Sequence, residues 1–152
     1  MNLSANFTLD ELTVSETAAR RGIDNSAPAH VIPDLMRLAR DVLQPLRDHL
    51  GRPVVVTSGY RSRATNSAVG GALNSDHLAG RAADIIVPGM TPREVCRAIS
   101  DLALPFRQCI QEFGARGWAH VSIPIDGQAP ERELLTASLG PGGGVQYRRG
   151  LV

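Results

Sequence analysis

The sequence has no apolar run of about 18 residues, the length from which a membrane-spanning helix would be expected. It has few aromatic residues, 4% of the chain, and almost no net charge, +1 over 152 residues. We therefore expect no membrane span, and the charge balance gives no indication of a nucleic-acid partner. Residues 1–22 lack the basic and then apolar segments of a secretory signal, so we expect none.

Cysteine is also scarce. The chain has only Cys96 and Cys109, which form no C-x-x-C pair and are too few for a disulfide framework. We predict two reduced thiols in or near the core. Glycine (15) and proline (10) are frequent, which favours many turns. The length suits a single domain over residues 1–152, and this composition favours an α+β fold over a helical bundle.

Helix signals begin near the N-terminus. Residues 7–12 and 15–22 are predicted to form short helices, with Thr8 and Ser15 as N-caps and Gly22 as the stop. The next helix is predicted over residues 33–50, because apolar residues recur there at helical spacing: Leu35, Leu38, Val42, Leu46 and Leu50.

Two prolines indicate where the longer helices break or begin. Pro45 is expected to kink or split the helix over residues 33–50. A second strong helix signal lies at residues 91–102, where Thr91 is the predicted N-cap, Pro92 takes the first position and Glu94 closes a capping box.

The remaining segments indicate strands. Residues 53–60 and 82–87 are predicted to be buried strands, joined by a long polar, glycine-rich loop over residues 61–80 with one helical turn at most. Two β-hairpins are expected after residue 106, the first around "GARG" and the second around "LGPGGG". This order predicts a small, mostly antiparallel sheet with helices packed on one face.

The stretch "SDHLAGRAAD", residues 75–84, places His77 and Asp84 in a frame of small residues that leaves room for a metal. Strand alternation in "WAHVSI" puts Ala119, Val121 and Ile123 on the core face, so His120 faces the other side. His77, Asp84 and His120 would then form the three-ligand set of a catalytic zinc site in a cleft over the sheet. Taken singly, His120 also fits an ordinary strand histidine and Asp84 a turn or salt-bridge group. His30 and His49 are interpreted as surface residues.

The same stretch resembles the S-x-H-x-x-G-x-A-x-D signature of the zinc D-alanyl-D-alanine carboxypeptidase-like peptidases, the M15 family. "TSGYRS" before it and "WAHVS" after it match that family in type and order. The opening "FTLDELTVSETAARRGIDN" and the helix ending "VLQPLRDHLG" resemble a subgroup common in bacteriophage and prophage genomes.

The resemblance implies one zinc ion per chain, with His77, Asp84 and His120 as its ligands. It also implies that Arg61 binds substrate and stabilises the developing oxyanion, for which a guanidinium is suited; the alternative is a salt bridge within the loop. Ser75 matches the signature serine and is expected to orient a ligand or bind substrate. Trp118 is expected to line the cleft, although packing at a sheet edge is the alternative.

One position departs from the family. Known members carry an acid three residues before the last histidine, and here that position is Gly117. The nearest upstream acid is Glu112 in "QEFGARGWAH", and phage-type relatives also have "EFG" shortly before that histidine. We therefore predict Glu112 as the general base. The alternative is that Glu112 is a surface acid and the protein a weak or inactive relative.

The resemblance implies hydrolysis of amide bonds in the peptide stem or cross-bridge of bacterial peptidoglycan. It suggests a monomeric enzyme of the phage or prophage endolysin type, held in the host cytoplasm before release to the cell wall, or one associated with the virion. Alternatives are a non-catalytic zinc-containing peptidoglycan-binding or structural phage protein, and a peptidase for free D-alanyl-D-alanine dipeptides. The basic end "QYRRGLV" is interpreted as an edge strand with solvated arginines.

Overall fold

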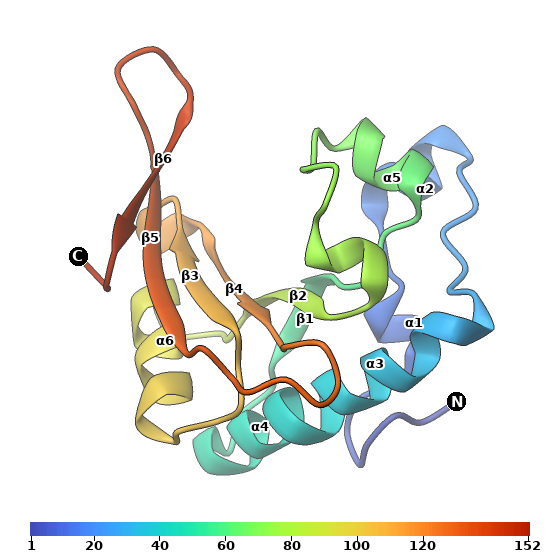
Figure 1. Cartoon of the computed structure of the whole chain (residues 1–152), viewed down its shortest axis with the longest axis horizontal. Coiled ribbons are helices and arrows are strands. Elements are labelled where there is room, and N and C mark those ends of the chain that lie inside the picture. Colours follow the sequence, from blue (N-terminus) through green and yellow to red (C-terminus); the bar gives the residue numbers. More distant parts are fainter.

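The computed structural model describes residues 1–152, and its six strands form one sheet in the order β1-β2-β4-β3-β5-β6 (Figure 1). The strands are β1 (Val55–Ser58), β2 (Ala82–Ile86), β3 (Gln108–Glu112), β4 (Trp118–Ser122), β5 (Glu133–Leu139) and β6 (Val145–Arg149). Every neighbouring pair is antiparallel except β3 and β5, which run parallel. The predicted α+β class, its mostly antiparallel sheet and both hairpins are confirmed.

The helical segments follow the capping signals of the sequence. They are α1 (Leu9–Leu12), α2 (Glu16–Arg21), η1 (Ala29–Val31), α3 (Ile32–Leu38), η2 (Ala39–Leu43), α4 (Gln44–Leu50), α5 (Arg63–Ala68), η3 (Asp76–Ala79), α6 (Pro92–Asp101) and η4 (Gly114–Arg116). The side chains of Thr8, Ser15 and Thr91 each accept a backbone N–H of the following turn, and Glu94 closes the capping box with Thr91. None of these helices has the length and apolar character needed to cross a membrane.

Pro45 splits the long helix, as predicted. The turn before it, η2, is a π-helix in which the N–H of Gln44 donates to the carbonyl of Ala39, five residues back. Proline has no N–H and its ring crowds the carbonyl four residues earlier, so the wider π turn is where the chain absorbs the misfit. The axis continues through α4 to Gly51, which ends the helix in the left-handed conformation.

The core lies between one face of the sheet and the helices α3–α4 and α6. It is a single cluster of 25 buried residues, in which Ala119, Val121 and Ile123 have the predicted inward position. Cys96 of α6 and Cys109 of β3 are both free and fully buried there, as expected for structural thiols. The opposite face of the sheet remains available for a cleft.

The segment over residues 61–80 differs from its prediction as a long loop with at most one helical turn. It contains two short helices, α5 and η3. Ser62 caps α5 by accepting the N–H of Thr65. Asn25 fixes the entry to this segment, because its amide donates to the carbonyl of Tyr60 and accepts the N–H of Ser62. The segment is therefore tied to the N-terminal part of the chain and cannot be treated as an independent loop.

Candidate metal centre

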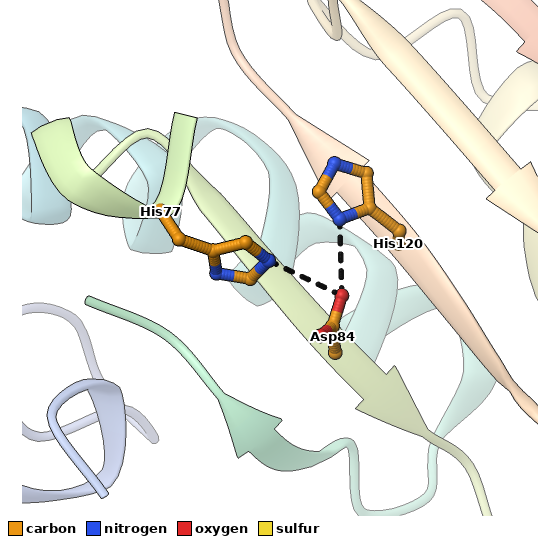
Figure 2. Close-up of side chains that lie close together, drawn as sticks. All are labelled: His77, Asp84 and His120. Atoms are coloured by element: carbon orange, nitrogen blue, oxygen red, sulfur yellow. Dashed lines mark hydrogen bonds and ion pairs between the residues drawn. The ribbon is translucent and has the colours of Figure 1, made fainter. Parts of the chain in front are cut away.

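Three elements bring His77, Asp84 and His120 together (Figure 2). His77 lies on η3, Asp84 on β2 and His120 directly opposite Asp84 on β4. Oδ1 of Asp84 lies 3.0 Å from Nδ1 of His120 and 3.4 Å from Nε2 of His77. The three candidate ligand atoms all lie within 4.8 Å of one another. The predicted trio is therefore assembled on one face of the sheet.

The His77 ring is held by a backbone carbonyl. Its Nδ1 lies 2.7 Å from the carbonyl oxygen of Gly59. Because a carbonyl oxygen can only accept, Nδ1 carries the proton and Nε2 keeps its lone pair for a ligand. Position 59 requires glycine, because a Cβ atom there would lie 2.3 Å from the carbonyl oxygen of Leu12. Ser75 begins the turn by accepting the N–H of His77, so it orients this histidine.

The other oxygen of Asp84 is bound by Arg61. Nη2 of Arg61 lies 3.2 Å from Oδ2, while Nε donates to the hydroxyl of Ser58 and Nη1 to the side-chain oxygen of Asn66. Asn66 is buried and its amide donates to the carbonyl of Ala72. The guanidinium is thus held rigidly, and the loop salt bridge considered for Arg61 is made with a candidate metal ligand.

The electrostatics of the group follow from these contacts. Burial favours the neutral form of Asp84, but the two imidazoles outweigh it and hold the pKa of this carboxyl far below its usual range. For His120, burial favours the neutral ring, but the Asp84 carboxylate outweighs it and raises the pKa. Without a metal, therefore, the Asp84 carboxylate favours the protonated form of His120, and Asp84 itself stays ionised.

This donor set fits zinc. Two imidazole nitrogens and one carboxylate oxygen are one of the ligand sets found in catalytic zinc sites, which leave one position of the tetrahedron open. Ligand atoms about 2.0–2.1 Å from zinc lie about 3.3–3.4 Å apart in a tetrahedron. The distances of 3.0 and 3.4 Å from the Asp84 oxygen to the two nitrogens are close to that spacing. The two histidine nitrogens lie within 4.8 Å of each other, so a bound metal would need them no further apart than the Asp84 oxygen already is from each.

The group lies in a cleft of about 610 Å³. One side of this cleft is formed by residues 69–77, which follow α5, and the other by residues of β3, β5 and β6. Figure 1 shows these strands on the left and α5 with the chain that follows it on the right. The lining includes every residue that the sequence predicted for the site: Arg61, Ser75, His77, Asp84, Glu112, Trp118 and His120.

Comparison with known proteins agrees with this arrangement. A sequence model of the family described as Peptidase M15 matches residues 5–122. The chain belongs to the Peptidase M15 family. A 44-residue stretch is 50% identical to the "Zinc D-Ala-D-Ala carboxypeptidase" of Streptomyces albus G. That stretch is 28% of this chain and only 17% of the Streptomyces enzyme.

In this M15 chain, Glu112 shares the cleft with the candidate ligands. It lies opposite Trp118 in the β3–β4 pair, two pairs further along than His120 and Ile110 and therefore on the same face of the sheet. Burial and the negative charge of Asp84 raise the pKa of Glu112, against the attraction of His120 and Arg61. The buried indole N–H of Trp118 has no partner in hydrogen-bond geometry, although it is near enough to lower the pKa of Glu112 slightly.

Gly117, the position at which the family resemblance led us to expect an acid, has no room for a side chain unless the hairpin tip shifts. A Cβ atom at Gly117 would lie 1.6 Å from the carbonyl oxygen of Glu112. The tip is further shaped by Phe113, which has a positive φ of 63° and packs edge-on against Trp118 at 5.4 Å. The tight tip therefore disfavours an acid at position 117. Besides the candidate ligand Asp84, the cleft contains Glu112 and Asp76, and Asp76 is paired with Arg107.

Several cleft residues have no signal in the sequence. Arg107 bridges the cleft by donating to Asp76 from Nε and Nη2, at 3.1 and 2.6 Å. Asn66 buttresses Arg61, and Tyr147 reaches the cleft from β6. These positions are far apart along the chain, and only the folded sheet brings them to one site.

Proposed function

We propose that this protein is a zinc-dependent peptidase that hydrolyses amide bonds in the peptide part of bacterial peptidoglycan. The observation that carries the proposal is the occurrence of a zinc-type ligand trio, a carboxyl of raised pKa and a fixed guanidinium in one cleft. The substrate class is supported by the name of the Streptomyces relative and by the resemblance of the sequence motifs.

His77, Asp84 and His120 would hold the metal, through Nε2, Oδ1 and Nδ1 respectively. Zinc bound there would polarise the substrate carbonyl and make water a stronger nucleophile near neutral pH. We assign Glu112 as the general base. Its carboxylate takes a proton from water as the oxygen attacks the carbonyl carbon, and then delivers that proton to the amide nitrogen as the C–N bond breaks.

Arg61 is assigned to the oxyanion. A guanidinium has five N–H donors, and three of them are engaged by Ser58, Asn66 and Asp84. Two donors are left for a substrate oxygen on the cleft side, and their position is fixed before substrate arrives. Ser75 acts through His77, because its hydroxyl oxygen accepts the backbone N–H of that histidine. Trp118 forms part of the cleft wall.

We further propose that residues 1–152 act as one monomeric peptidase domain, because one hydrophobic core joins the N-terminal helices to the sheet. The finer proposal is a lytic enzyme of phage or prophage type, either an endolysin or a virion-associated protein. It rests on the resemblance of residues 7–25 and 42–51, and of "EFG" before His120, to phage-type sequences. Lysis of bacterial cells by external addition of the purified protein, compared with expression inside cells, tests this role.

The first experiment measures the zinc content of the purified protein together with release of amino groups from purified peptidoglycan, with and without a chelator. About one zinc per chain and chelator-sensitive release would support the enzyme. Mass spectrometry of the released ends would identify the bond, and parallel assays with D-alanyl-D-alanine test the dipeptide alternative. Zinc without release from any substrate would instead favour a non-catalytic binding or structural protein.

A further inference from the structure

The cleft extends beyond the part of the chain that matches the family. That match ends at residue 122, whereas β5 and β6 lie between residues 133 and 149. Yet Leu135 of β5 and Tyr147 of β6 line the same cleft as the candidate metal ligands. The C-terminal hairpin therefore contributes to the site from outside the residues that match the family.

The strand register shows where this extension lies. At the level of the metal centre, Asp84 pairs with His120, His120 with Ile110, and Ile110 with Leu135. Side chains that are paired across strands lie on the same face of a sheet. Ile110 and Leu135 thus form an apolar floor that leads from the metal ligands toward β6.

The residues two positions further along the strands border one side of this apolar surface. Glu112 pairs with Ala137, and Ala137 with Tyr147. Ala137 is small and 1% exposed, so the two larger side chains can approach each other over it. Burial and the charge of Glu112 raise the pKa of Tyr147, so its hydroxyl stays protonated at neutral pH and can donate a hydrogen bond.

The opposite side of the apolar surface is lined by polar side chains that hydrogen-bond to one another. The side-chain amide of Gln108 donates to Glu133 at 2.7 Å, and Arg107 donates to both Asp76 and Gln108. These groups satisfy one another, so they define the edge of the floor without an unpaired charge. Tyr147 lies on the other side and is 58% exposed, which leaves its hydroxyl open to a ligand.

We propose that the C-terminal hairpin forms a substrate subsite in which Ile110 and Leu135 hold an apolar side chain of the peptide and Tyr147 donates a hydrogen bond to its backbone carbonyl. This deepens the proposed function and rests on it. A cleft of about 610 Å³ is in the range that accommodates ligands well above dipeptide size. The protein should therefore prefer peptides that extend from the scissile amide onto the hairpin.

The test compares Tyr147→Phe with wild type on a dipeptide and on stem-type peptides that extend it at either end. Removing one hydrogen bond should raise KM by about 2- to 10-fold for the peptides extended at the end that reaches the hairpin. It should leave kcat and the dipeptide kinetics unchanged. Arg148→Ala is the matched control, because Arg148 pairs with Thr136 and faces the other side of β6. Equal kinetics of Tyr147→Phe and wild type on all peptides, or equal losses on short and long ones, would overturn the subsite.

A binding measurement separates this proposal from the proposed function. Calorimetry with zinc-loaded Glu112→Gln protein measures the Kd of the uncleaved extended peptides, with and without Tyr147→Phe. If wild type cleaves nothing but Tyr147→Phe weakens binding, the peptidase proposal fails and the subsite stands. If wild type cleaves and Tyr147→Phe changes neither Kd nor KM, the subsite fails alone. If the extended peptides are neither bound nor cleaved, both proposals fail.

Discussion

Nη2 of Arg61 lies 3.2 Å from Oδ2 of Asp84, the carboxylate oxygen that the two histidines leave free. The two oxygens of one carboxylate thus have separate partners, since Oδ1 faces the imidazoles and Oδ2 the guanidinium. A carboxylate held in this way presents a single oxygen to a metal. Arg61 is therefore a positioning group for the ligand set as well as the candidate oxyanion donor.

Arg61→Lys should weaken zinc binding by about 10- to 100-fold, the usual effect of removing a group that orients a metal ligand. Lysine has one charged nitrogen and cannot bond Ser58, Asn66 and Asp84 together as the guanidinium does. Competition with a chromogenic chelator measures this affinity independently of catalysis. The control is Arg63→Lys, at the exposed start of α5. An unchanged affinity in Arg61→Lys would show that Asp84 is oriented without the guanidinium.

His120→Ala should abolish stoichiometric zinc binding, because it removes one of three ligand atoms from the open site. Zinc at 100 times its Kd should stabilise the wild-type protein by about 2.7 kcal/mol, and the variant by much less. Thermal unfolding with graded zinc measures both. His49→Ala, at an exposed histidine, should behave as wild type. If the variant keeps the full zinc-dependent shift in Tm, the ligand assignment is wrong.

The parts that sequence predicted well are those governed by local rules. Capping residues such as Thr91 act within one helical turn, and strand alternation around His120 depends only on the period of the pleat. The spacing of His77 and Asp84 is likewise contained in ten residues. Local signals of this kind, together with the resemblance to the M15 motifs, predicted the trio that the structure brings together.

The remainder depends on pairing between distant strands. The parallel placement of β5 beside β3 has no signature in either strand, yet it brings Tyr147 across Ala137 toward Glu112. Helix α5 was missed because it is only six residues long and lies in a polar, glycine-rich stretch. The sequence signal that could have located its start is Ser62, which caps the helix. Consequently the candidate ligand trio could be predicted from the sequence, whereas the part of the cleft formed by β5 and β6 could not.

Gly117→Asp should destabilise the protein and should not restore a more typical site. Its Cβ atom would collide with the carbonyl of Glu112 at 1.6 Å, so the hairpin tip must move. Forced overpacking costs about 1–3 kcal/mol, which corresponds to a fall in Tm of several degrees for a domain of this size. Gly142→Ala, where a Cβ atom meets nothing within 4 Å, is the control. A Gly117→Asp protein with unchanged Tm and raised activity would contradict the assignment of Glu112.

Glu112→Gln should abolish hydrolysis while zinc stays bound, because an amide cannot accept the proton from water. In the wild type, kcat/KM should fall as the pH drops below the pKa of Glu112, which burial and Asp84 raise above the usual glutamate range. Pre-steady-state and steady-state assays over a pH series measure this limb. Glu131→Gln, at an exposed carboxyl, should keep the wild-type profile.

The Glu112 carboxyl should also make the unfolding free energy of the metal-free protein depend on pH, and the direction of its pKa shift sets the sign. Because the folded protein raises the pKa of Glu112, the folded state holds the proton more tightly than the unfolded chain. Stability from this group is thus fully present below the unfolded pKa and is lost as the pH rises through the folded one. Glu112→Gln does not titrate, so its unfolding free energy relative to wild type should increase over that pH window. Chemical denaturation in chelator at several pH values measures the difference, and a constant difference would mean that Glu112 is as well solvated in the cleft as in the unfolded chain.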